Sequence, residues 1–218
     1  MVTGRIHSIF VVLLVAGIAL HAETVDRIAV SVGNTGITES EVEQEARFAL
    51  FPDGRPQPSK LSDDSMLAAR QRLIEHSLLR EESEAEETEA GELTEEANRL
   101  LQEARTLYSS EAEYQDALEA AGYTQTQARH QLVEIVRILR LVNRRLRPNA
   151  WVNRMDIENY YSATFVPEHE RSESEPPPAL EDVESIIREI LIQKEVDRLL
   201  NEWIKEIQAS RHVVIHSQ

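Results

Sequence analysis

Apolar side chains recur at every third or fourth position through most of the chain, which is the spacing of helices with one buried face. The most regular stretch covers residues 125–147, and its expected inward positions are Leu132, Ile135, Val136, Leu139, Val142 and Leu146. Three more apolar residues lie on a second side of this stretch, namely Val133, Ile138 and Leu141. We therefore expect this helix to be packed on two faces. A second long helix is expected over residues 180–210, with Val183, Ile187, Ile190, Leu191, Leu199, Leu200, Trp203 and Ile207 on its inner side.

The starts of several helices are marked by a serine or threonine followed three residues later by glutamate or glutamine, which is a capping box. Thr38, Ser110 and Thr124 stand at such starts, and Gly122 is placed to end the short helix after Ser110. Ser62 or Asp63 can cap another helix, whose apolar stripe is Leu67, Leu73, Ile74 and Leu78. Thr94 is expected to cap a further one, with Leu100, Leu101, Ala104 and Leu107 facing inward, and residues 153–165 form one more.

Short strands are expected at the two chain ends. Residues 25–33 alternate apolar and polar side chains, residues 34–36 have turn composition, and residues 212–216 form a second alternating stretch. Because neither strand is stable alone, we expect one two-stranded ladder that joins the N- and C-terminal segments. The fold class is therefore mainly α. Residues 23–166 and 180–218 form a single discontinuous helical domain, and the proline-rich residues 167–179 form a linker.

The first 22 residues read as a secretory signal rather than as part of the fold. Arg5 precedes an unbroken apolar run over residues 9–20, and cleavage is expected after Ala22. A helix of that length spans about 18 Å, against roughly 30 Å for the hydrocarbon core of a bilayer, so an uncleaved anchor is the minor alternative. We expect a periplasmic protein with no stable membrane insertion after cleavage.

The amino-acid composition excludes several classes of function. The 218 residues contain 23 Lys and Arg, 39 Asp and Glu and no Cys, so the formal net charge is 23 − 39 = −16. The missing cysteines exclude disulfides, thiolate metal sites and cysteine nucleophiles. The excess of acids argues against a general nucleic-acid binder, which needs a cationic face. No hydrolase, phosphate-loop, zinc or dinucleotide signature is present, and we therefore assign no catalytic, metal-binding or cofactor-binding residue and expect no enzyme.

Charged and aromatic residues supply the candidate binding positions. Six arginines and no acid lie within residues 135–155, whereas residues 81–96 hold nine acids and no base. The arginines are either solvated helix surface, which we favour, or a face that binds an acidic ligand or docks on the acidic run. Aromatic pairs near helix ends are either core residues or exposed anchors for unfolded polypeptides. The candidate peptide-binding residues are Phe48, Phe51, Tyr160, Tyr161, Arg137, Arg140 and Arg144.

The order of short motifs resembles the N-terminal domain of the SurA-type periplasmic chaperones. A strand containing Val25-Asp26-Arg27-Ile28 is followed by Ile37-Thr38-Glu39-Ser40-Glu41-Val42 and by a helix with Leu73-Ile74-Glu75. Asp156-Ile157-Glu158-Asn159-Tyr160-Tyr161 and a closing segment with Trp203, Ile207 and Val213-Val214-Ile215 come later. The resemblance implies a helical peptide-binding module that shields unfolded or nascent exported proteins, possible outer-membrane proteins among them, without ATP.

One departure from that family decides the expected chemistry. Its members carry a prolyl-isomerase domain between the Tyr-Tyr helix and the closing helix, where this chain has only residues 166–179. A domain needs about 50 residues at least, so the isomerase residues of the family have no positions here. The first expectation is a holdase-type chaperone without isomerase activity. The alternatives are a structural or targeting subunit that uses the same module for one fixed protein partner, or a divergent isomerase.

Overall fold

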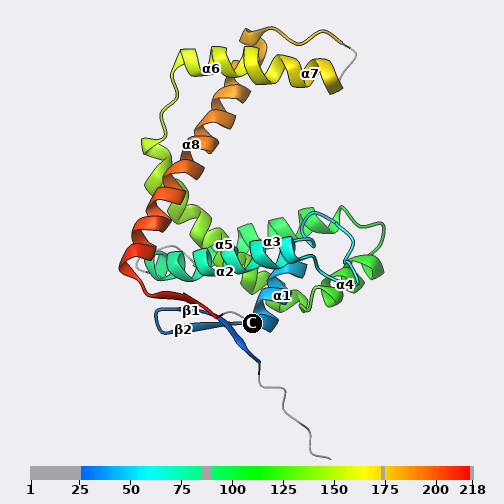
Figure 1. Ribbon diagram of the computed structural model, residues 1–218. Helices are drawn as coiled ribbons and strands as arrows, with labels where there is room; N and C mark the ends of the chain where they lie inside the picture. The colour runs from blue at the N-terminus through cyan, green and yellow to red at the C-terminus, as the bar shows by residue number, and fades with distance from the viewer. Residues whose placement is uncertain (1–25, 85–89, 173–174, 217–218) are drawn as a thin grey trace, which may run out of the picture.

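The computed structural model describes residues 26–84, 90–172 and 175–216 (Figure 1). The chain is mainly helical with one small antiparallel sheet, which confirms the predicted fold class. A body at one end contains the sheet and α1–α5, and a helical arm stands away from it, joined by the long helix α8 (Figure 1). The predicted signal in residues 1–22 lies outside the described residues.

The sheet joins the two ends of the described chain, as predicted, but it has three strands in the order β2-β1-β3. The strands are β1 (Ile28–Val32), β2 (Thr35–Thr38) and β3 (Val213–Ile215). The predicted two-stranded ladder is therefore too small, because residues 35 and 36 already pair with β1 instead of forming a turn. Gly33 allows the tight reversal with a φ of 55°, and it places Ile37 in the core.

Five helices form the rest of the body. They are α1 (Glu39–Phe48), α2 (Asp63–Glu84), α3 (Ala90–Arg105), α4 (Glu111–Ala120) and α5 (Gln125–Leu146). Thr38 and Thr124 form complete capping boxes, and the Ser110 hydroxyl accepts from the amide of Glu113. The Ser62 hydroxyl accepts from the amide of Ser65, so serine rather than Asp63 caps α2. The prediction for Thr94 is wrong, because α3 already includes Ala90 and the Thr94 hydroxyl donates to the Ala90 carbonyl.

Three leucines expected in the core are exposed: Leu67 by 64%, Leu107 by 57% and Leu139 by 51%. The buried face of α2 passes through Ala69 instead of Leu67. Leu107 lies beyond the end of α3, where the helical period no longer places it inward. Helix α5 contributes residues to two separate clusters, which confirms that it is packed on two faces. Leu139 is exposed although the helical period places it on the same side as Leu132 and Val142.

The arm is a longer helical segment than the sequence predicts. It consists of α6 (Arg154–Tyr160), a π-helical turn η2 (Tyr161–Phe165) and α7 (Val166–Ser172), preceded by the short 3-10 turn η1 (Arg147–Asn149). The prediction of a linker from residue 166 or 167 is therefore wrong. Pro167 lacks an amide hydrogen and its ring crowds the carbonyl four residues earlier, and a widened π turn directly before it accommodates both effects. The described part of the connection to α8 is residues 175–179.

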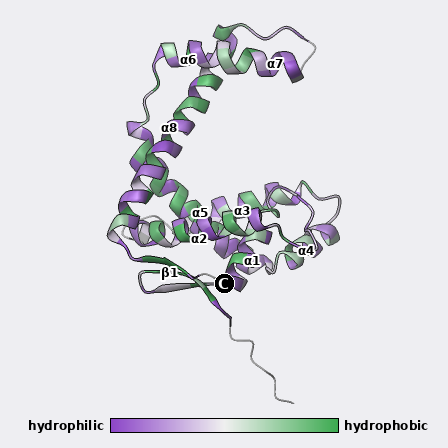
Figure 2. Cartoon of the chain, in the orientation of Figure 1, coloured by the Kyte–Doolittle hydropathy of each residue, from purple (hydrophilic) through white to green (hydrophobic). Residues whose placement is uncertain are grey.

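Helix α8 (Leu180–Ser210) has the predicted bounds and completes two separate apolar clusters. At its C-terminal end, Val196, Trp203 and Ile207 join residues of the sheet, α1, α2 and α5 in the largest cluster. At its N-terminal end, Val183 and Ile187 pack with Ile157 of α6. Figure 2 shows hydrophobic and hydrophilic residues alternating along this helix from the arm to the sheet.

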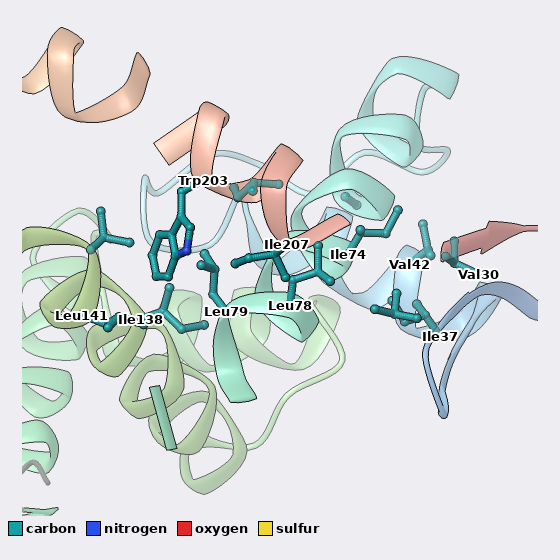
Figure 3. Packing of buried hydrophobic residues seen from close by; sticks show 14 of the residues in the cluster. Val30, Ile37, Val42, Ile74, Leu78, Leu79, Ile138, Leu141, Trp203 and Ile207 are labelled. Carbon is teal, nitrogen blue, oxygen red and sulfur yellow. The ribbon is translucent and has the colours of Figure 1, made fainter. Parts of the chain in front are cut away.

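Trp203 lies at the contact between α8 and the body. It is 7% exposed, and Figure 3 shows its ring beside Ile138 and Leu141 of α5, with Leu79 of α2 close by. The guanidinium of Arg145 lies 4.4 Å from the centre of the ring, on its face. This side chain therefore links α8 to both α5 and α2.

We expect Trp203→Ala to lower the free energy of unfolding by about 3–5 kcal/mol, because the change leaves a cavity at the junction of three helices. The matched control is Trp151→Ala, since Trp151 is 75% exposed. The control should change stability by no more than about 0.5 kcal/mol. Urea unfolding followed by circular dichroism measures both. Equal effects of the two substitutions would contradict this placement of α8.

Candidate functional site

An opening lined mostly by apolar residues lies between α3, α5 and the loop after α1. Its volume is about 390 Å³. We call it the α3–α5 groove, and its lining residues are Phe51, Pro52, Leu100, Glu103, Ala104, Thr106, Leu107 and Leu132. All but two of these residues are apolar, and Leu107 is more than half exposed. The groove therefore offers hydrocarbon surface to a ligand while Glu103 supplies a negative charge at its edge.

One wall of the groove is the loop after α1, and an aromatic cluster holds this loop in place. Phe51 is fully buried, with its ring 5.8 Å from that of Tyr108 and 5.4 Å from that of Tyr114. The Tyr108 hydroxyl donates to the Phe51 carbonyl at 2.7 Å. Burial raises the pKa of Tyr108, so the hydroxyl stays a donor throughout the neutral range. These contacts fix Pro52 at the rim.

Leu107 is held beside this wall by close packing against glycine. Gly54 has a φ of 65°, and a β-carbon added to it would lie 2.9 Å from Cβ of Leu107. Only a residue without a side chain permits that approach. Leu107 is therefore supported from one side and exposed on the other, and it adds apolar surface to the lining of the groove.

An ion pair also joins α3 and α5, nearer the N-terminal end of α3 than the groove. Arg140 places Nη1 at 2.7 Å from Glu92 Oε2 and Nη2 at 2.8 Å from Glu96 Oε2. Hydrogen bonds to Glu96 and Glu92 raise the pKa of Arg140. Here the arginine-rich segment docks on the acidic run, so the preference for solvated surface is wrong for Arg140. Such a contact holds the two helices in register more than it stabilises them, because surface pairs contribute about 0–1 kcal/mol.

Arg137 and Arg140 contact different acidic partners. Arg137 lies 3.5 Å from Glu134 of its own helix, whereas Arg140 pairs with glutamates of α3. Arg144 is exposed near the end of α5.

The four aromatic candidates are divided between the body and the arm. Phe48 and Phe51 are buried in the second cluster of the body, with their rings 6.1 Å apart. The option that they are exposed anchors is therefore wrong, although Phe51 borders the groove. Tyr160 and Tyr161 are half-buried in the arm, where they pack against Ile157, Val183 and Ile187. The sequence missed Leu107 and Pro52, because turn composition after a helix does not tell which side chains stay exposed.

Two further openings in the body are lined mainly by polar residue types. One of about 370 Å³ lies between α1 and α4 and is lined by Asp26, Glu41, Glu43 and Glu119 among other residues. Another of about 230 Å³ lies between β2, α2 and α5 and includes His76, Arg80, Gln131 and Glu134. In the described parts of the chain no group of three or more acidic or histidine side chains is placed to hold a metal ion. Among those same residues, no helix is both long and apolar enough to cross a membrane.

A buried polar contact lies near the second of these openings. Glu45 of α1 is buried, with Oε1 2.8 Å from Arg72 Nε of α2 and Oε2 3.5 Å from Gln131 Nε2 of α5. Burial lowers the pKa of the neighbouring His76, although the charges of Glu45 and Glu75 act in the opposite direction. Burial also raises the pKa of Tyr123 to about 12, with Glu45 contributing. The three helices thus meet around one carboxylate and a neutral imidazole.

No family model matches the chain, and no curated protein matches it.

The lowered pKa of His76 predicts how stability depends on pH. The unfolded chain takes up a proton at this histidine near pH 6.5, before the folded chain does, so acidification favours unfolding. We expect the urea midpoint to fall as the pH drops below about 6.5 and to continue falling until the lower pKa of the folded state is reached. His76→Gln removes this contribution and should reduce the slope between pH 7.5 and pH 5.5. Identical slopes for the two proteins would contradict the prediction.

Proposed function

We propose that this protein is an exported, ATP-independent holdase that binds unfolded polypeptides in the periplasm without changing a covalent bond. The observation that carries the proposal is the α3–α5 groove, an open and mostly apolar cavity of about 390 Å³ with Leu107 exposed at its edge. Its volume lies within the usual range of roughly 300–1,000 Å³ for ligand sites, so it accommodates a few apolar side chains of an extended segment.

The physical basis of binding is the removal of apolar surface from water. Each Å² buried contributes roughly 25 cal/mol before the cost of ordering the bound segment. A groove of this size leaves micromolar rather than nanomolar affinity, because ordering and association costs offset most of the gain. Such binding is reversible without an energy source. The net charge of −16, or −17 once Arg5 is removed with the signal, keeps loaded molecules apart by mutual repulsion.

The resemblance to the SurA-type chaperones agrees with this proposal in the order of the short motifs, whereas the expected absence of an isomerase insert is a departure from that family. The described connection between α7 and α8 is short, and α7 takes up residues 167–172 of the expected linker 167–179. We accordingly propose binding without prolyl isomerisation. Unfolded or nascent exported proteins are the proposed partners, with outer-membrane proteins as one class.

A fixed-partner role is the second candidate, and one observation favours it. Trp151 is 75% exposed at the base of the arm, and Met155 of the arm and Ile186 of α8 are also exposed. Tryptophan is enriched among the residues that contribute most to permanent and specific interfaces. A structural or targeting subunit would use such a surface for one partner rather than for many.

A light-scattering assay with an unfolded β-rich protein tests the chaperone proposal. The mature protein should suppress aggregation at near-stoichiometric ratio without ATP. Leu107→Glu places a charge in the groove and should weaken suppression about ten-fold, because a carboxylate in contact with apolar ligand atoms loses hydration. The matched control is Leu67→Glu on α2, which changes an equally exposed leucine away from the groove.

Varying the salt concentration in the same assay distinguishes binding by the groove from binding by the arginine-rich segment. Charged surface contacts are screened over about 8–10 Å at physiological ionic strength, whereas apolar contacts are not weakened. Suppression that persists in 0.5–1 M salt, roughly the range where the screening length falls toward 3 Å, supports the groove. Suppression that disappears in salt would move the function to the arginine-rich segment. No suppression by folded protein at any salt concentration would leave the fixed-partner role.

A further inference from the structure

The arm carries a pair of aromatic rings at an irregular place in its helix. Tyr161 and Phe165 are the first and last residues of the π-helical turn, and their rings stack with centroids 5.8 Å apart and an angle of 18° between them. Single π turns are rare and occur frequently at functional sites, because they turn side chains out of the ordinary helical register. We call these two rings the aromatic pair of the arm.

Three consecutive prolines precede α8, and the last of them contacts one member of this pair. Pro176, Pro177 and Pro178 follow one another, and the last two are half-buried although they belong to a connection. The Tyr161 hydroxyl donates to the Pro178 carbonyl oxygen at 2.9 Å. Figure 1 shows the connection running back along α7 toward the top of α8.

This contact has the chemistry of polyproline recognition. A run of prolines adopts an extended left-handed helix without internal hydrogen bonds, so its carbonyl groups are available to a donor. Proteins that bind such segments offer aromatic rings for the proline side chains and hydrogen-bond donors for the carbonyls. Tyr161 provides both a ring and a hydroxyl, and the stacked Phe165 extends the flat surface.

We propose that the aromatic pair is a recognition surface for proline-rich extended segments, and that residues 176–178 occupy it as a ligand from the same chain. A proline-rich segment of another polypeptide replaces them there. This surface belongs to the arm, and the inference does not depend on the α3–α5 groove.

The neighbouring contacts keep the pair in position when the proline segment leaves. Both rings pack against the small cluster of Ile157, Val183 and Ile187, which ties α6 to α8. The ammonium group of Lys194 of α8 lies 4.5 Å from the ring centre of Tyr160, the last residue of α6 before the π turn. A preformed surface binds with a smaller ordering cost than one that must be assembled.

The occupying segment reduces the apparent affinity for an external one. A ligand joined by a short connection has a millimolar effective concentration, so it holds the site against weak competitors. The affinity that an external peptide shows is lowered in proportion to the fraction of molecules whose site is open. Replacing the prolines therefore increases binding, whereas removing an aromatic ring decreases it.

The test uses a fluorescein-labelled peptide of ten prolines and fluorescence anisotropy on the full mature chain. In one variant, residues 176–178 are changed to Gly-Ser-Gly, which keeps the length of the connection. This variant should bind the peptide about ten-fold more tightly than the unchanged protein, because a site that is open in about a tenth of the molecules becomes open in all. A labelled glycine–serine peptide of equal length should bind neither protein.

Second substitutions in the Gly-Ser-Gly variant identify the surface. Phe165→Ala should abolish the gain, and Tyr161→Phe, which keeps the ring and removes the donor, should reduce it about five-fold. Trp151→Ala and Leu107→Glu should leave it unchanged, since neither residue belongs to the pair. Circular dichroism checks that each variant is folded. If Phe165→Ala does not fold, the result with Tyr161→Phe alone tests the proposed surface.

Three results would overturn the inference. They are equal affinity of the unchanged and Gly-Ser-Gly proteins, a gain that survives Tyr161→Phe undiminished, and a gain that disappears with Leu107→Glu. In the last case the peptide binds in the α3–α5 groove, so the proposed chaperone function stands while the arm surface fails. Aggregation suppression by the Tyr161→Phe protein tests the groove separately.

Discussion

Helix α8 extends beyond each of the two apolar clusters to which it contributes, and the shape of the molecule follows from its length. Its 31 residues span about 46 Å at 1.5 Å per residue. Its C-terminal part is buried among the sheet, α2 and α5, and its N-terminal part is buried only against the arm. A single helix therefore has to supply both clusters, because the short α6 cannot cover an apolar face by itself. The arm exists as a separate unit because α8 carries it away from the body.

The same constraint explains which parts of the fold are predictable from sequence. Thr38, Ser110 and Thr124 cap helices through local hydrogen bonds, and α8 begins and ends where its apolar period does. Pairing between the terminal strands also follows from the sequence, since each needs a partner. These features depend on residues close in sequence or, for the terminal strands, on there being no other strand for each to pair with in the predicted fold. They set the order of elements and the mainly α fold class.

Other features depend on contacts that sequence spacing does not contain. Pro167 suggests the end of a helix, and the π turn that accommodates it leaves no periodic signal. Leu107 and Leu139 fit apolar stripes, yet Leu107 lies past the end of its helix and Leu139 is exposed within its own. Phe51 looks like a surface aromatic in a loop, and three ring contacts bury it. The candidate site is therefore only partly predictable from the sequence. Its walls lie in predicted helices, whereas its exposed residues come from the connections.

The walls of the α3–α5 groove are held in place by contacts outside the groove, and not by side chains that fill it. Arg140 ties the two helices nearer the N-terminal end of α3, and the buried ring of Phe51 fixes the loop after α1. Closing the groove would require Leu107 to move inward, away from its contact with Gly54. A groove held in this way needs little reorganisation before an apolar side chain enters, so weak individual contacts remain sufficient for reversible binding. The aromatic pair packs against the N-terminal part of α8, whereas the body packs against its C-terminal part. On the two proposals made above, a polypeptide that reached both surfaces would gain from their joint use without stronger contact at either, and it would still leave one surface at a time.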